Sequence, residues 1–178
     1  MRVSSGLRPR EANHQPLTPV TFLWRAAASH PDKVAVIDGN ERLTYREFEQ
    51  FTRRMAGMLE QTGVVPGDIV SVLAPSCIAM LAAHFAVPMT GAALNTINTR
   101  LDAETIAFML RHGGARALIT DREFSATIEA ALALLDERPL VIDIDDPSFV
   151  GGKTVGEIGY EAFLADRKST RLNSSHRR

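Results

Sequence analysis

The stretch Gly67–Leu101, GDIVSVLAPSCIAMLAAHFAVPMTGAALNTINTRL, decides the fold of this chain. Its first apolar run, Ile69–Ala74, is typical of a strand buried on both faces. Cys77–Val87 is apolar on almost every side and predicts a helix, and Gly91–Leu94 predicts a second short strand. Because a helix that is apolar on most sides must be covered on most sides, the stretch indicates a βαβ unit inside a layered α/β fold.

The limits of these elements are marked by residues that break or cap regular structure. Pro75 ends the first strand, and Ser76 is positioned to cap the start of the helix. Pro88 is expected to stop the helix.

The residues before this unit predict two helices and a hairpin. Thr18 and Pro19 form a helix start, and His30-Pro31 ends that helix. Thr44 and Glu47 form a capping box at the start of a second helix. On the first helix we expect an apolar stripe of Val20, Leu23, Trp24 and Ala27. A hairpin is expected to pair Val34–Ile37 with Arg42–Thr44 around the turn Asp38-Gly39-Asn40. The second helix carries Tyr45, Phe48, Phe51 or Thr52, Met55, Met58 and Leu59 at helical spacing.

Helical and strand patterns continue to alternate after Leu101. One predicted helix starts at Asp102 and ends at Gly113-Gly114, and another starts at Asp121. Predicted strands cover Arg116–Thr120 and Leu140–Ile144. Alternation of this kind predicts a largely parallel sheet with flanking helices. The predicted fold class is therefore α/β, with an N-terminal β-hairpin.

Composition excludes several classes of protein. The 178 residues are 45% hydrophobic and 23% charged, with a net charge of -1, which gives no electrostatic reason to expect a nucleic-acid or anionic membrane partner. The single cysteine, Cys77, rules out an internal disulfide and fits a reducing compartment. No apolar run is long enough to span a bilayer, and the N-terminus lacks a secretory signal, so we expect a cytoplasmic protein.

Two polar clusters near the end of the sheet invite functional interpretations. Gly151–Thr154 is similar to the end of a phosphate-binding P-loop, but Val155-Gly156 is a poor helix start, and a surface turn is favoured. Asp143, Asp145 and Asp146 carry oxygen ligands suited to a hard cation. No spaced loop with a closing glutamate follows them, so a solvated strand exit is favoured.

Single titratable residues also have two interpretations. His84 lies in the apolar helix and is favoured as a hydrogen-bonded core residue, whereas His112 complements a helix dipole in a last turn. Cys77 stands at a helix start, where its pKa can fall and make it a nucleophile, but small packing is favoured. No paired histidine spacing supports a zinc site.

The run Asn95–Arg100 follows a predicted strand at its carboxyl end, the side on which open α/β sheets bind ligands. Capping and turn hydrogen bonds explain its Asn and Thr residues equally well. Both interpretations stay open from the sequence.

Three segments together resemble the N-terminal part of adenylate-forming (AMP-binding) acid–CoA ligases. They are PLTPVTFLWRAAASHPDKVAVIDGNERLTYREF at 16–48, the run at 67–124, and RPLVIDIDD at 138–146. The hairpin with its Thr-Tyr-x-Glu helix, the Gly-Asp-x-Val strand and the Asn-Thr-x-Asn-Thr-Arg-Leu run follow in the family's order. The branch most resembled is the acyl-CoA synthetases that act on medium-chain fatty acids and methylmercaptopropionate.

The resemblance implies a two-step reaction. A carboxylic acid, here expected to be a fatty acid, attacks the α-phosphate of ATP to give an acyl-adenylate and pyrophosphate. The thiol of coenzyme A then displaces AMP and yields the thioester. Mg²⁺ assists by offsetting phosphate charge. ATP, Mg²⁺, coenzyme A and the acid are therefore the implied cofactors and partners of the full-length enzyme.

The family's Ser/Thr/Gly-rich phosphate loop would lie beyond this sequence, so no catalytic, cofactor-binding or metal-binding residue is carried over to a position here. We expect an inactive fragment that binds none of these cofactors tightly. An interrupted sheet leaves an exposed edge and an uncovered apolar face, which predicts self-association.

The sequence divides into three parts. We expect an irregular N-terminus at 1–15, a partial AMP-binding domain at 16–165 with a short final helix at Tyr160–Ala165, and a tail at 166–178. The tail, DRKSTRLNSSHRR, resembles the translation of a sequencing-library adapter and is interpreted as non-native. Two other classes remain as alternatives, namely a free-standing nucleotide- or effector-binding α/β module and a structural or interaction protein.

Overall fold

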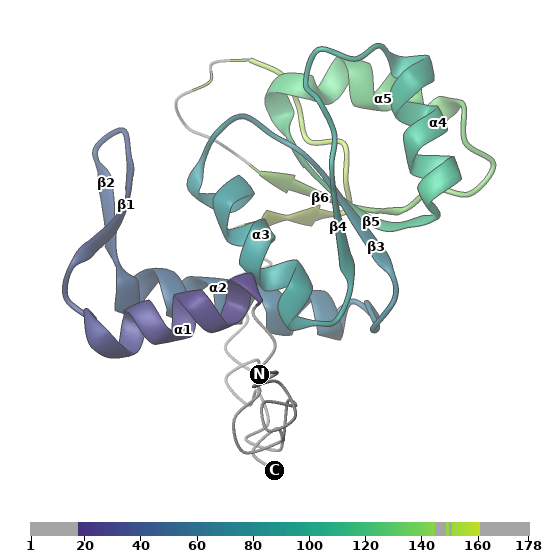
Figure 1. Ribbon diagram of the computed structural model, residues 1–178. Coiled ribbons are helices and arrows are strands. Elements are labelled where there is room, and N and C mark those ends of the chain that lie inside the picture. Colours follow the sequence, from purple (N-terminus) through teal and green to yellow (C-terminus); the bar gives the residue numbers. More distant parts are fainter. Residues whose placement is uncertain (1–17, 145–148, 150, 161–178) are drawn as a thin grey trace, which may run out of the picture.

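A parallel sheet and a separate hairpin organise the chain, which the computed structural model describes over residues 18–144, 149 and 151–160. Within those residues the sheet has five strands in the order β4-β3-β5-β6-β7, all parallel, and the hairpin pairs β1 with β2 antiparallel (Figure 1). The elements are α1 Pro19–Ser29, β1 Val34–Asp38, β2 Glu41–Thr44, α2 Tyr45–Gln61, β3 Ile69–Leu73, α3 Ile78–Met89, β4 Ala93–Thr96, α4 Ala103–Gly113, β5 Ala115–Asp121, the 3-10 helix η1 Arg122–Phe124, α5 Ser125–Ala133, β6 Leu140–Ile144 and β7 Ile158–Gly159.

The two faces of the sheet carry separate cores. On β3, Val70 packs into the core shared with α1, α2 and α3, and Leu73 packs into the core shared with α4 and α5. Val70 lies opposite Leu94 of β4 and Ala117 of β5 in the parallel register. This alternation follows from the two-residue period of a strand. It explains why β3 carries apolar side chains on both faces, with Ser71 as its one polar residue. The predicted α/β class with a largely parallel sheet and an N-terminal hairpin is confirmed.

Helix α3 lies between the sheet and the pair α1–α2 (Figure 1). Its residues Ala82, Ala83 and Ala86 are fully buried, and their small size allows close packing on both sides. Phe85 meets Phe48 of α2 edge-to-face, with ring centroids 5.6 Å apart. Enclosure on both sides is what the all-round apolar sequence of this helix requires.

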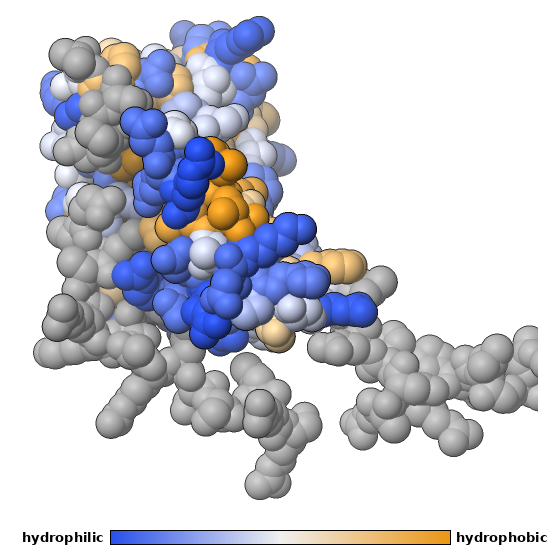
Figure 2. Space-filling view, turned by 90° about the vertical axis from the view of Figure 1, so that its left-hand side faces the viewer, coloured by the Kyte–Doolittle hydropathy of each residue, from blue (hydrophilic) through white to orange (hydrophobic). Residues whose placement is uncertain are grey.

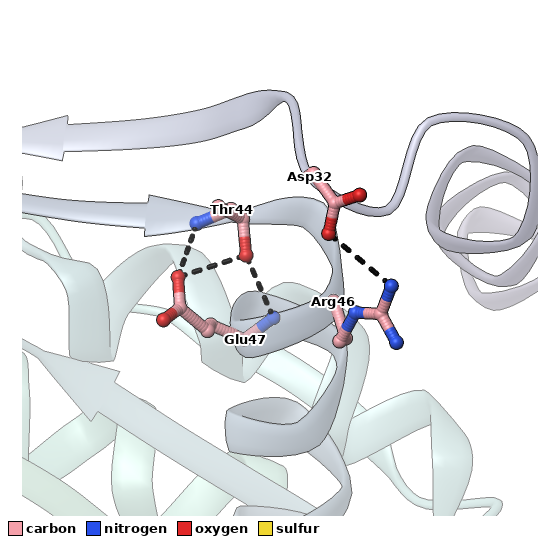
Figure 3. A network of polar contacts seen from close by, with 4 residues as sticks. All are labelled: Asp32, Thr44, Arg46 and Glu47. Carbon is pink, nitrogen blue, oxygen red and sulfur yellow. Dashed lines mark hydrogen bonds and ion pairs between the residues drawn. The ribbon is translucent and has the colours of Figure 1, made fainter.

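Hydrogen bonds from side chains fix the start of α2 (Figure 3). The Glu47 carboxylate accepts from the Thr44 N–H and the Thr44 hydroxyl, each at 2.8 Å, and the Glu47 N–H donates to Thr44 Oγ1 at 3.3 Å. The same bonds hold the pKa of Glu47 below its usual range. The predicted capping box is confirmed, and Thr18 forms a second one at α1. Beside the capping box of α2, Arg46 Nη2 pairs with Asp32 Oδ1 at 3.2 Å on the exposed surface.

Several boundaries differ from the sequence-based prediction. Pro88 lies inside the last turn of α3 and does not stop it, since the helix runs to Met89. Strand β4 begins at Ala93 and reaches Thr96, so the first two residues of the predicted Asn95–Arg100 loop belong to the strand. Residues Arg122–Phe124 form a 3-10 turn ahead of α5, which therefore begins at Ser125.

Some predicted residue roles were also wrong, and others lie outside the described residues. Trp24 was assigned to the buried stripe of α1 but is 41% exposed, with the Arg53 guanidinium 5.2 Å from its ring centroid. The parts 1–15 and 166–178, and the helix Tyr160–Ala165 beyond its first residue, lie outside the described residues. Strand β7 was not predicted. Among the described helices, none is both long and apolar enough to cross a membrane.

Enlarging a small residue of α3 tests the enclosure of that helix. We expect Ala83→Leu to lower the free energy of unfolding by about 1–3 kcal/mol, because extra methyl groups have no space in a closely packed core. Ala133→Leu, at an exposed position of α5, is the matched control and is expected to change it by less than about 0.5 kcal/mol. Urea unfolding followed by circular dichroism measures both, and equal effects would contradict the enclosure.

Candidate functional site

The order of the strands identifies the position at which open α/β sheets usually bind ligands. From β3 the chain passes through α3 on one face to the edge strand β4, and from β5 it passes through α5 on the other face to β6. The carboxyl ends of β3 and β5 are therefore a topological switch point, the usual ligand position in open α/β sheets. The loop before α3 and Asp121 at the end of β5 lie there.

The start of α3 is capped by a residue from the hairpin. Cys77 occupies the N-cap position, but its side chain makes no capping hydrogen bond. Instead, the Ile78 N–H donates to Asp38 Oδ2 at 3.0 Å, across 40 positions of the sequence. Ser76, which we predicted as the cap, does not cap the helix. The role of Asp38 was missed because an Asp-Gly pair between two strands indicates only a turn.

The environment of Cys77 disfavours the thiolate. Burial raises the pKa of the Cys77 thiol, the N–H groups of Met80 and Ala79 lower it, and the carboxylates of Asp38 and Asp121 raise it further. The raising effects prevail, so the group is a neutral thiol near pH 7. This outcome supports the packing interpretation over the nucleophile.

The Asn95–Arg100 run is held in place by its own polar groups. Asn95 Nδ2 donates to Ser71 Oγ at 3.1 Å, and Asn98 Oδ1 accepts from the Arg100 N–H at 2.9 Å. Between them, Ile97 is buried and its N–H donates to the Val72 carbonyl at 2.8 Å. These contacts favour the capping and turn interpretation that the sequence left open, and the run follows an edge strand instead of the switch point.

Gly151–Thr154 is an exposed strap beside the start of α5 and not a P-loop. The Lys153 N–H donates to Ser125 Oγ at 3.3 Å, and Lys153 Nζ pairs with Glu129 at 2.8 Å. Gly152 has φ +67°, and a Cβ there would collide with the Arg122 carbonyl. No helix begins at Lys153, so the backbone N–H groups are not arranged around an anion. The predicted surface turn is confirmed.

The carboxylate of Asp143 binds the two residues that follow this strap, Val155 and Gly156. Asp143 is buried, and its two oxygens accept the Val155 N–H at 3.0 Å and the Gly156 N–H at 2.6 Å. Asp145 and Asp146 lie outside the described residues. Within the described part, no group of three or more His, Cys, Asp and Glu side chains is arranged to hold a metal ion.

His84 and His112, two of the five histidines, lie on helix surfaces. His84 Nδ1 contacts the Met80 carbonyl at 2.9 Å, but the side chain is exposed, so its assignment to the core was wrong. His112 lies in the last turn of α4, as predicted, and stacks on Phe108 with ring centroids 5.3 Å apart. Neither histidine lies beside a second titratable group that would make an acid–base pair in the contacts described.

Comparison with known proteins decides the family. The model of the family described as AMP-binding enzyme matches residues 23–168. The chain belongs to the AMP-binding enzyme family. The chain is 41% identical over 166 residues to the peroxisomal acetate/butyrate–CoA ligase AAE7 of Arabidopsis thaliana. It is 45% identical over 124 residues to the peroxisomal trans-cinnamate:CoA ligase of Petunia hybrida. These matches cover 86% and 70% of this chain.

Solved structures share the fold of this AMP-binding chain. O-succinylbenzoate coenzyme A synthetase from Bacillus subtilis, in complex with AMP, has a TM-score of 0.62 and 26% identity over 72% of the chain. The anthranilate CoA ligase AuaEII, in complex with anthranoyl-AMP, has a TM-score of 0.76 and 23% identity over 87% of the chain. The named relatives are acid–thiol ligases, as the resemblance implied. The chain spans 29% of the length of AAE7, 22% of the cinnamate ligase and 31% of the synthetase.

Removal of the Asp38 carboxylate tests the cap of α3. We expect Asp38→Ala to lower the free energy of unfolding by about 1 kcal/mol, because the first N–H of α3 loses its acceptor. Asp38→Asn retains an amide oxygen in the same place and should lose much less. Asp32→Ala removes only an exposed ion pair and serves as the control. Denaturant titration of the three variants measures the ranking, and an Asp38→Ala variant as stable as the control would contradict it.

The pH profile of cysteine alkylation tests the electrostatics of the switch point. With Cys77 as the only cysteine, the iodoacetamide rate reports its thiolate fraction directly. We expect the midpoint to lie above that of a small peptide thiol. Asp38→Asn should lower the midpoint, because it removes a negative charge that opposes the thiolate, while Asp32→Asn should leave it unchanged. A midpoint at or below the peptide value would contradict the direction of the pKa shift.

Proposed function

We propose that this chain supplies the N-terminal scaffold of an acid–CoA ligase. The complete ligase activates a fatty acid with ATP to an acyl-adenylate and transfers the acyl group to coenzyme A. The observation that carries the proposal is the 41% identity to an acetate/butyrate–CoA ligase over 166 residues, which covers 86% of this chain. Relatives are named as CoA ligases for acetate and butyrate, which are aliphatic acids, and for benzoate, which is aromatic. The relative named for aliphatic acids supports a fatty acid as the substrate.

In this proposal the chain by itself catalyses neither step. The polar groups that sequence analysis singled out are engaged in holding the fold: Asp143 accepts two backbone N–H groups, Asn95 bonds Ser71, and Lys153 pairs with Glu129. Groups with such partners are costly to redirect toward a ligand, because the partners would lose their hydrogen bonds. These contacts support a scaffold and not a nucleotide site.

ATP, Mg²⁺ and coenzyme A are, in this proposal, ligands of the complete ligase, and the isolated chain binds none of them tightly. One solved relative is in complex with AMP and another with anthranoyl-AMP, which supports an adenylate in the complete enzyme. The proposed location is the cytoplasm, supported by a single cysteine that pairs with no other. The plant relatives are named as peroxisomal proteins.

We also propose that the isolated chain associates with itself. Several large apolar side chains are exposed on its surface, among them Ile37 and Phe108. Exposed apolar groups of this kind favour association, as does β1, which within the described residues pairs on one edge only.

A chimera tests the scaffold role. We expect that replacing the matching segment of AAE7 by the corresponding residues of this chain gives an enzyme that still forms butyryl-CoA, because the exchanged segment supplies packing and not reacting groups. A chimera carrying Ala83→Leu should lose stability before it loses turnover, and one carrying Lys153→Ala should keep both. A folded chimera without ligase activity would contradict the proposal.

Calorimetry on the isolated chain separates the ligase scaffold from a free-standing nucleotide- or effector-binding module. ATP with Mg²⁺, AMP and coenzyme A should each give no saturable heat. Saturable binding of any of them, abolished by Asn98→Ala in the Asn95–Arg100 run, would favour the module. Capture of one discrete partner without any effect of the nucleotides would favour an interaction protein.

A further inference from the structure

A groove between the hairpin and α3 is open to solvent on one side of the molecule. Its lining includes Val36 and Ile37 of β1, Cys77 before α3, and Ile78, Met80 and Leu81 of α3, around a cavity of about 300 Å³. We call this the hairpin groove. At one end it is closed by the bond from the Ile78 N–H to Asp38. Ser76 and His84 also line the groove. Its walls are therefore mainly apolar, with polar groups among them and a hydrogen bond at one end.

The hairpin groove exposes apolar side chains from both of its walls. Ile37 of β1 is 61% exposed and Leu81 of α3 is 39% exposed. Figure 2 faces the hairpin side and shows hydrophobic residues gathered in the middle of this face with hydrophilic residues around them. An apolar centre with a polar rim is the usual form of a protein-binding surface.

We propose that the hairpin groove binds a second copy of this chain in a two-fold dimer. Across the two-fold axis, Ile37 of each copy enters the groove of the other, and the two β1 strands run antiparallel. The inference deepens the self-association proposed above and rests on it. It is independent of the ligase activity, which the chimera tests separately.

The groove is complementary to itself, which a two-fold interface requires. Ile37 is exposed and lines the same groove that, in the proposed dimer, receives Ile37 of the second copy. The inserting side chain and the groove that accepts it therefore lie next to each other on one surface. In the described residues β1 pairs only with β2, which leaves its other edge with N–H and C=O groups for an antiparallel neighbour. Between Lys33 and Asp38 this strand carries none of the charges that protect exposed edges.

Charge at the ends of β1 favours the antiparallel arrangement. Lys33 precedes the strand and is exposed, and Asp38 ends it with only Oδ2 engaged by the Ile78 N–H. Antiparallel strands bring the start of one beside the end of the other, so Lys33 of each copy lies alongside Asp38 of its partner. Opposite charges then meet at both ends of the contact, whereas a parallel arrangement would place like charges together.

The test combines the oligomeric state with the reactivity of Cys77. Sedimentation velocity over a range of concentrations should show a monomer–dimer equilibrium for the chain. Ile37→Lys and, separately, Leu81→Lys should shift it at least tenfold toward monomer, because each buries an unpaired charge in the contact. Leu134→Lys is the matched control, since Leu134, the C-cap residue of α5, is 50% exposed and does not line the groove. This variant should leave the equilibrium unchanged.

Two further readouts are specific to this geometry. Alkylation of Cys77, the only thiol, should slow as the concentration of the chain rises, and Ile37→Lys should remove that protection. Lys33→Glu should weaken the dimer most at low salt, because it places two like charges together at each end. A monomer at all concentrations, a dimer that survives both groove variants, or one that Leu134→Lys dissolves would overturn the proposal.

Discussion

Enclosure of α3 is the constraint on which the rest of this structure depends. The helix is apolar around almost its whole circumference, so neither the sheet nor a neighbouring helix alone removes it from water. Its buried alanines, Ala82, Ala83 and Ala86, allow the sheet to pack on one side and α1 with α2 on the other. The N-terminal helices and the hairpin are therefore a required layer of the domain and not an appendage. Capping of α3 by Asp38 ties that layer to the helix start with one hydrogen bond.

The cost of leaving a buried or half-buried polar group without a hydrogen bond explains why Asp143, Asn95 and Asp38 stabilise the fold. A carboxylate or amide buried at the end of a strand must be hydrogen-bonded, and here the available partners are backbone N–H groups and neighbouring side chains. Asp143 holds the strap after β6, Asn95 bonds Ser71, and Asp38 bonds α3. The switch point itself holds a neutral thiol and the carboxylate of Asp121. Membership of the AMP-binding family and a match to 29% of the length of AAE7 agree with a scaffold of this kind.

Most of the fold could be predicted from the sequence, because its strongest signals are local. The capping box at Thr44 and Glu47, the apolar strands and the left-handed Gly114 each depend on near neighbours. The errors arose where distant residues decide the outcome. Asp38 replaces Ser76 at α3, tertiary contacts permit a strand through Asn95 and Thr96, and Pro88 is tolerated in a last turn. Strand β7 is too short to have a periodic signal and forms through pairing with β6. The engagement of Asp143 by Val155 and Gly156 also needs the fold before it can be recognised.

Native-state hydrogen exchange tests the central claim most directly. If the enclosed α3 holds the two sides of the domain together, its amides should be among the most protected in the chain. They should exchange only with global unfolding, at the free energy that denaturant titration gives. The amides of α4 and α5, which cover the other face, should open at equal or lower free energies. Exchange from α3 by local opening, while α4 and α5 stay protected, would contradict the account.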